Sequence, residues 1–277
     1  MEIPLFPLHA VLCPGIVLPL HVFEDRYRAL TRHCLATGTP FGIVLIRDGR
    51  EAGSDTTPAL AGVGALVEIR EAGRYADGRY DLLAAATGRF AIDAVDAGRA
   101  PYLVADVTPL EDDVGDEARA ERLAATAVRR FVRYLELMRI RDGETGEALD
   151  IRVEIDAPGP DEPDPTVRDL GFVGISDPGG SGPERPGVEA GATSDDAPGP
   201  DDGPVLAIPD DPTVLSYLLS GIVQIELPRR QRLLEAATTV ERLEQLLVLL
   251  DREVFLLTHR LRCFTPDRHA AAGARRS

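Results

Sequence analysis

The chain has 277 residues, and 46 acidic residues against 30 basic ones give it a formal net charge of −16. The sequence contains no lysine, so every basic residue is an arginine. Without a lysine the chain cannot form a P-loop, a Ser-Lys dyad or a Schiff base, and we expect no enzyme activity. The acidic balance also argues against a nucleic-acid partner, because phosphate binding needs clustered cations.

The chain shows no sign of a membrane or secreted protein. No apolar run reaches the roughly 18 residues of a membrane span, and the first residues lack the basic stretch of a signal peptide. The three cysteines lie far apart, which favours reduced thiols over a disulfide framework. We therefore expect a cytoplasmic protein.

Residues 1–110 have the pattern of a β-rich region. Short apolar runs with alternating character are separated by turn signals containing Gly or Pro, which predicts a small barrel or sandwich. The runs predict about six strands, at Ile16–Val22, Phe41–Arg47, Gly64–Glu71, Arg79–Ala85, Phe90–Val95 and Tyr102–Val107. One helix is expected from Glu24 to Ala36, ended by Gly38, with Tyr27, Leu30, Cys34 and Leu35 on its apolar face.

After Pro109 the apolar period changes to that of a helix. Asp116–Ile140 predicts a long amphipathic helix. Asp211 followed by Pro212 predicts a helix start, and Pro228 begins a short helix that runs to Glu235. Thr238 and Glu241 have capping-box spacing at the start of the last helix.

Residues 157–204 stand apart from the rest of the sequence. They hold ten Pro and ten Gly, and eleven acids against two arginines, so we expect them to be disordered. An apolar island at Leu170–Ile175 is either an ordinary part of a linker or a short docking segment, which could occupy the chain's own binding site. Because loop-closure entropy grows slowly with length, deleting residues 160–202 should leave thermal stability nearly unchanged.

These patterns divide the chain into five parts. They are a β-rich domain at 1–110, a first bundle helix with an extension at 111–156, the insertion at 157–204, a helical bundle at 205–262 that packs with 111–156, and a disordered tail at 263–277.

Several segments stand in a characteristic order along the chain: Ile3–Leu8, Val11–Gly15, Leu18–Tyr27, Phe41–Leu45, Asp77–Leu82, Thr87–Phe90, Pro101–Ala105 and Asp210–Glu235. Together they resemble the N-terminal substrate-binding domain of Lon proteases, and the stand-alone bacterial members of that family most of all. Two features depart from the family: Cys13 stands where an aromatic residue is usual, and the acidic insertion interrupts the helical half.

The resemblance implies an α+β fold, a PUA-like β-barrel followed by an α-helical bundle. It also implies a non-catalytic module that binds unfolded or tagged polypeptides, with a protease as a candidate partner and with no cofactor. By the same resemblance, polypeptide contact falls at a strand-to-helix junction formed by Phe23, Glu24, Arg26 and Tyr27. The alternative for these residues is a solvated first helical turn whose acids favour the helix dipole.

Another class of function is a PUA-like binder of a small molecule or RNA. A ligand cage built from tryptophan is excluded, because the chain has none. The spacing of His and Cys residues predicts no zinc site, and no serine lies in a nucleophile motif. The pattern makes no prediction about oligomeric state.

Overall fold

The computed structural model describes residues 1–48, 59–141 and 208–264. All described strands and helices belong to one compact unit, made of Met1–Ala148 and Pro209–Ser277. The insertion expected at 157–204 lies outside the described residues, as does all but the start of the tail.

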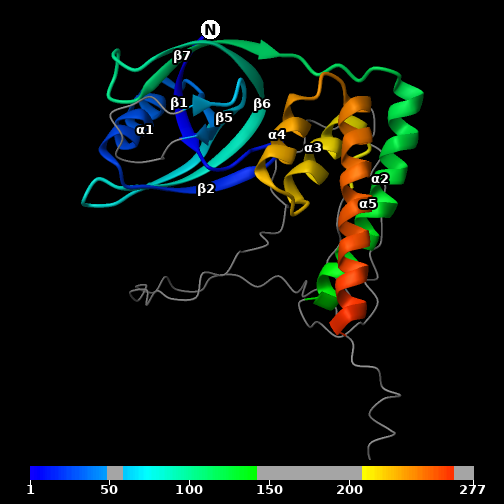
Figure 1. Cartoon of the computed structure of the whole chain (residues 1–277). Helices are drawn as coiled ribbons and strands as arrows, with labels where there is room; N and C mark the ends of the chain where they lie inside the picture. The colour runs from blue at the N-terminus through cyan, green and yellow to red at the C-terminus, as the bar shows by residue number, and fades with distance from the viewer. Residues whose placement is uncertain (49–58, 142–207, 265–277) are drawn as a thin grey trace, which may run out of the picture. The chain divides into compact units, whose positions relative to one another are not determined.

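The β-rich part is one sheet of seven strands (Figure 1). The strands are β1 (Glu2–Leu8), β2 (Val17–Val22), β3 (Phe41–Asp48), β4 (Ala59–Leu60), β5 (Val63–Arg74), β6 (Tyr80–Asp96) and β7 (Leu103–Leu110). Their order is β1-β7-β6-β5-β3-β4, and β2 pairs with β6. β1 also pairs in parallel with β3, so that Leu5 lies between Leu103 of β7 and Gly42 of β3. The strand pairings therefore run from β1 around the sheet and return to β1.

The sequence predicted two strands where the structure has the single long strand β6. The Thr87-Gly88 turn signal marks a bulge instead of a reversal: Gly88 pairs with Leu66 and Ala86 pairs with Val67, which leaves Thr87 as the extra residue. β1 was not predicted because Pro4 and Pro7 interrupt its apolar pattern, and β4 was missed because it has only two residues.

Two glycines in the sheet make room for one aromatic ring. A Cβ atom added at Gly42 or at Gly64 would lie 2.6 Å from the ring of Phe90. The same atom at Gly64 would lie 2.7 Å from the backbone oxygen of Ile43, which cannot move aside. Gly64 lies in β5, within a strand that the sequence predicted, and lets Phe90 fill the core.

Helix α1 (Asp25–Thr37) follows β2 and ends as the sequence predicted. Gly38 adopts a φ of 69°, and its N–H donates to the carbonyl of Cys34 at 2.8 Å. The predicted face is correct for Tyr27, Leu30 and Cys34, which are buried, and wrong for Leu35, which is exposed. Leu35 follows Cys34 directly, and the helical turn carries it past the edge of the buried face.

Four helices follow the sheet in the part of the chain that the structure describes. They are α2 (Glu117–Arg141), α3 (Pro212–Ile222), α4 (Leu227–Glu235) and α5 (Thr239–Phe264). The side chain of Asp211 accepts from the N–H groups of Thr213 and Val214, as expected for the cap of α3. At the start of α5, Thr238 accepts from the N–H of Glu241, while the Glu241 carboxylate accepts from Ala237 instead of from Thr238.

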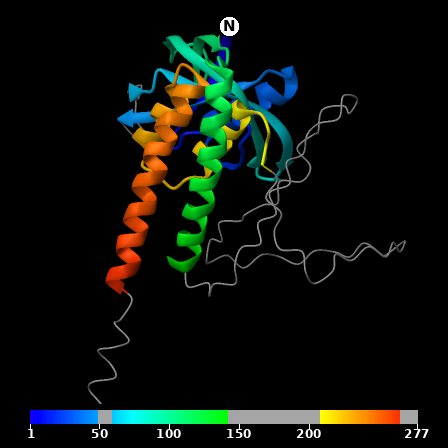
Figure 2. The same ribbon diagram turned by 90° about the vertical axis from the view of Figure 1, so that its right-hand side faces the viewer.

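Helices α2 and α5 run side by side (Figures 1 and 2). α2 buries small and aromatic side chains, among them Ala120, Ala127 and Phe131. An exposed ion pair joins the two helices, with 3.0 Å between Arg130 Nε and Asp251 Oδ1. In the described part of the chain, no helix is both long and apolar enough to cross a membrane.

Two buried arginines connect the sheet to the helices. Arg89 of β6 donates to the carbonyls of Leu234 and Ala236 at 2.9 and 2.8 Å. These carbonyls lie at the C-terminal end of α4, where the helix leaves acceptors unpaired and favours a cation. Arg89 also donates to Asp112 at 2.8 Å.

The second buried arginine, Arg242 of α5, lies over the ring of Tyr217 at 3.7 Å. It donates to the Tyr217 hydroxyl at 2.7 Å and to Ser216 at 2.9 Å. Burial lowers the pKa of Arg242 and raises that of Tyr217. A charged, hydrogen-bonded cluster therefore occupies the boundary between the sheet and the helices, with only Nε of Arg89 lacking a partner among the cluster's guanidinium nitrogens in the described residues.

Candidate functional site

The strand-to-helix junction predicted from the family resemblance exposes one aromatic side chain. Phe23 is 61% exposed, just before α1. Glu24 and Arg26 form an ion pair with 3.0 Å between Oε2 and Nε, and the Arg26 guanidinium lies 4.4 Å from the centre of the Tyr27 ring. The junction therefore presents an apolar ring beside a neutralised pair of charges.

Tyr27 does not share this exposure. Its ring is buried and stacks on Phe6, with 3.9 Å between the ring centres. Tyr27 helps to line a hollow of about 160 Å³, which Phe23 and Glu24 also border. Tyr27 therefore borders the hollow from within the core, and its ring is not part of the exposed surface. The hollow has room for about one side chain.

A hydrogen-bonded cluster lies next to this junction. Asp81 accepts from Tyr75 and is 2.6 Å from Nδ1 of His21, whose ring stacks near Phe23. These hydrogen bonds lower the pKa of Asp81. Asp81 and His21 are each about half exposed, so solvent surrounds the pair, and the geometry is that of a surface network rather than of an activated base.

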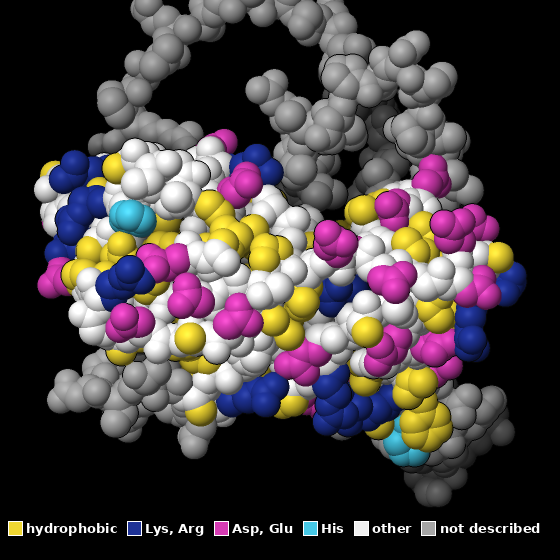
Figure 3. All heavy atoms as spheres, turned by 90° about the horizontal axis from the view of Figure 1, so that it is seen from above, with side chains coloured by type: hydrophobic (Ala, Val, Ile, Leu, Met, Phe, Trp, Pro, Cys, Tyr) yellow, Lys and Arg dark blue, Asp and Glu magenta, His cyan; other side chains and the backbone are white. Residues whose placement is uncertain are grey.

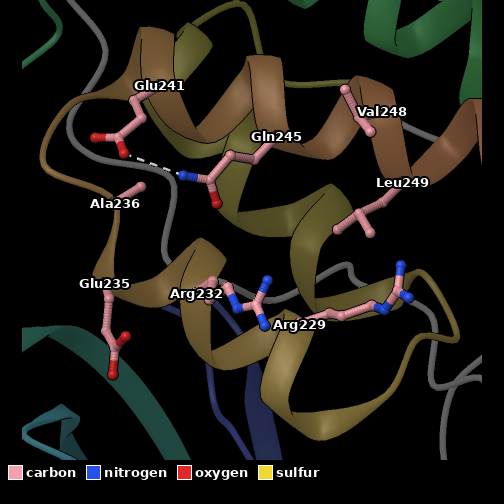
Figure 4. A pocket seen from close by; sticks show the side chains of 8 residues that line it. All are labelled: Arg229, Arg232, Glu235, Ala236, Glu241, Gln245, Val248 and Leu249. Carbon is pink, nitrogen blue, oxygen red and sulfur yellow. Dashed lines mark hydrogen bonds between the residues drawn. The ribbon is translucent and has the colours of Figure 1, made fainter.

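Two larger hollows flank helix α4. The first, of about 560 Å³, lies between α4 and α5. Figure 4 shows Glu241, Gln245, Val248 and Leu249 along α5, with Arg229, Arg232 and Glu235 on α4. Val248 is 71% exposed, although it is an apolar residue on a packed helix. This hollow combines an apolar wall with charged edges.

The second hollow, of about 610 Å³, lies between α4 and the end of β3. Its apolar lining comes from Leu45, Ile46, Leu227 and Pro228, and its polar lining from His9, Arg47, Gln231, Arg232 and Glu235. Because Arg232 and Glu235 line both hollows, the two adjoin along α4. We call the pair the α4 groove.

Most charges of the α4 groove are paired. Arg47 Nη2 lies 3.0 Å from Glu235 Oε1, and Arg229 Nε lies 2.8 Å from Glu226 Oε2. The pKa of Glu226 is lowered, first by a hydrogen bond from the backbone N–H of Glu226 and then by the positive charges of Arg229 and Arg252. Glu241 accepts from Ala237 and from Gln245.

The sequence did not identify the α4 groove. The short helix at Pro228–Glu235 was predicted, but only as a structural element. One local signal was available: Val248 occupies a position outside the leucine stripe of the last helix. The groove itself depends on Arg47 and Glu235, which are 188 positions apart.

No group of three or more His, Cys, Asp or Glu residues in the described segments is arranged to hold a metal ion. Figure 3 shows acidic side chains spread over both the sheet and the helices on one face, with apolar side chains between them. Cys13 and Cys34 are buried, and burial raises the pKa of each thiol to about 11. Neither thiol is therefore activated as a nucleophile.

Comparison with known proteins identifies the family. Residues 2–252 match the family model of the ATP-dependent protease La (LON) substrate-binding domain. A crystal structure of a Lon N-terminal domain protein from Xanthomonas campestris is similar over 90% of this chain and 98% of its own, with 23% identity and a TM-score of 0.50.

The N-terminal domain of a Mycobacterium avium complex Lon protease is similar over 91% of this chain and 98% of its own, with 16% identity and a TM-score of 0.52. These likenesses establish a Lon N-terminal domain fold that combines a β-sheet with helices. Together with the match over residues 2–252, they show that this chain belongs to the Lon substrate-binding domain family.

Proposed function

We propose that the chain binds unfolded or tagged polypeptides in the cytoplasm without cutting them, and that it works as an adaptor for a protease. Membership of a substrate-binding family supports the binding role. The absence of lysine from the sequence supports the non-catalytic part, because neither a P-loop nor a Ser-Lys dyad can form within it.

The α4 groove is the observation that carries this proposal. An unfolded chain offers apolar side chains and unpaired backbone groups, so its binding site needs an apolar surface or an open strand edge. The pairing of β1 with β3 ends at Leu8 and Leu45, whereas β3 continues to Asp48. Among the described residues, the last part of β3 has a strand neighbour only in β4, and its other side borders the groove.

The junction at Phe23, Glu24, Arg26 and Tyr27 is a second place of contact in this proposal. Its small hollow suits a single apolar side chain, and the exposed Phe23 ring adds surface beside it. Residues at the end of β1 border the junction hollow, and His9, the next residue along, lines the groove. A polypeptide can therefore use both places while it follows one edge of the sheet.

We also infer a barrel-and-bundle architecture for this module. The return of the strand pairings to β1 supports a closed barrel at 1–110. The packing of α2 against α5 supports a bundle in which 111–156 and 205–262 combine. The barrel would then hold the edge of β3 rigid, while the bundle provides α4 and α5 as the facing wall of the groove.

Fluorescence anisotropy with a labelled, permanently unfolded protein tests this function. We expect weak binding, with a Kd of about 10–500 μM, because ordering the client offsets much of the contact energy. Val248→Asp should weaken binding at least about threefold, because it places a charge in the apolar wall of the groove.

Phe255→Asp is the matched control. Phe255 lies on the same helix and is 69% exposed, but it does not line the groove. Phe23→Ser tests the junction separately. Absence of binding up to about 1 mM would reject the function, and equal losses from Val248→Asp and Phe255→Asp would reject the groove as its site.

A further inference from the structure

We infer that the α4 groove selects extended polypeptide segments in which one acidic side chain is flanked on both sides by apolar residues, with the acid bound by Arg232. This inference rests on the proposed polypeptide-binding function and adds the chemistry of the preferred client.

The first support is the unpaired charge of Arg232. Its guanidinium is exposed, and within the described part of the chain it has no hydrogen bond or ion pair. The other two arginines of the groove, Arg47 and Arg229, are paired with Glu235 and Glu226. Counting only partners among the described residues, the groove therefore presents one unpaired arginine, although the protein as a whole carries a net charge of −16.

The second support is the way in which the neighbouring acid is held. Glu235 lies one helical turn beyond Arg232, a spacing at which the two would ordinarily pair. Glu235 Oε1 instead accepts from Arg47 at 3.0 Å and from the buried Gln231 amide at 2.8 Å. The same Gln231 amide donates to the carbonyl of Val63 at 3.0 Å, which fixes it to β5. Hydrogen bonds thus hold the Glu235 carboxylate toward the sheet, and the Arg232 guanidinium remains available to bind a carboxylate of the client.

The position of Arg232 determines which carboxylate fits. Because Arg232 lines both hollows, an occupant that reaches it has apolar lining on either side, from Val248 and Leu249 in one direction and from Ile46 and Leu227 in the other. A terminal carboxylate would fill one hollow and leave the other empty. An acid inside a segment allows apolar neighbours to enter both hollows, and a guanidinium suits a carboxylate through paired N–H donors.

Three labelled nonapeptides test the inference by fluorescence anisotropy. The first has the centre Val-Leu-Asp-Leu-Val and an amidated C-terminus, and the second replaces its Asp with Asn. The third keeps the Asn and has a free C-terminal carboxylate. Each is titrated with the wild-type chain, with Arg232→Gln and with Arg32→Gln. Arg32 is the matched control, because it is also exposed and unpaired among the described residues but lies on α1.

We expect the Asp peptide to bind wild type at least about threefold more tightly than the Asn peptide, the preference typical of an exposed ion pair. Arg232→Gln should remove this preference and Arg32→Gln should keep it. Equal binding of the Asp and Asn peptides would overturn the inference while leaving the polypeptide-binding function in place. A preference only for the free C-terminus, or one that survives Arg232→Gln, would overturn it equally. If none of the peptides binds and the unfolded protein does not bind either, the proposed function fails as well.

Discussion

Replacing Arg89 with methionine tests whether the buried arginine holds the sheet and the helices together. Methionine keeps most of the length of the side chain and removes all of its hydrogen bonds. The carbonyls of Leu234 and Ala236, at the end of α4, would both lose their donor. Asp112 would keep the hydroxyl of Tyr217 as a donor, so the main cost falls on the carbonyls.

The size of the effect follows from these contacts. Each buried carbonyl left without a donor costs about 1–3 kcal/mol. Part of this loss of stability is offset, because the variant no longer buries a charged guanidinium and buries an apolar thioether instead. We therefore expect Arg89→Met to lower the free energy of unfolding by about 3 kcal/mol, which corresponds to a fall in Tm of about 6–12 °C for a folded unit of this size.

Urea denaturation followed by far-ultraviolet circular dichroism measures this loss, since the chain has no tryptophan to report by fluorescence. Arg99→Met is the control. Arg99 pairs with Glu2 at the surface, where both side chains are about half exposed, so its loss should cost about 0.5 kcal/mol or less. A loss below about 1 kcal/mol for Arg89→Met, or one no larger than that of Arg99→Met, would refute the reasoning.

Two further predictions concern the core. Gly64→Ala should lower the free energy of unfolding by about 1–3 kcal/mol in the same denaturation assay, because the new methyl group meets the ring of Phe90 at 2.6 Å. Gly88→Ala is the control and should cost less than about 1 kcal/mol, because no atom lies within 4 Å of its new methyl group. Similar losses from the two variants would contradict this account. Cys13 and Cys34 should resist alkylation at pH 8.5 until urea unfolds the chain, because burial raises the pKa of each thiol to about 11. Since the unfolded thiols ionise near their ordinary pKa of 9.0, stability should be fully present below pH 9 and fall between pH 9 and pH 11, by roughly 2–3 kcal/mol per thiol at most. A flat profile over that range would count against their burial.

The helix ends could be predicted from the sequence because each depends on a few adjacent residues. Gly38 and Asp211 cap their helices as expected. The sheet was less predictable. β6 continues through Thr87-Gly88 because it accommodates Thr87 as an extra residue opposite β5, and no local pattern reveals a pairing partner so far along the chain.

The candidate site was also predictable only in part from the sequence. The resemblance placed Phe23 and Tyr27 together at one junction, but it did not indicate that Phe23 is exposed whereas Tyr27 is buried by stacking on Phe6 of β1. The α4 groove is formed by β3, α4 and α5, which come together only in three dimensions. Composition and periodicity describe each of these elements but not the space between them.

The contacts of Arg89 also limit how this module can be inherited. Every acceptor of its guanidinium lies at Glu111 or later, on the helical side of the chain. A recombination event that moved only the strands to a new protein would carry a buried cation without any of its partners. A protein that acquired the strands alone would therefore have to replace Arg89 or supply new acceptors for its guanidinium.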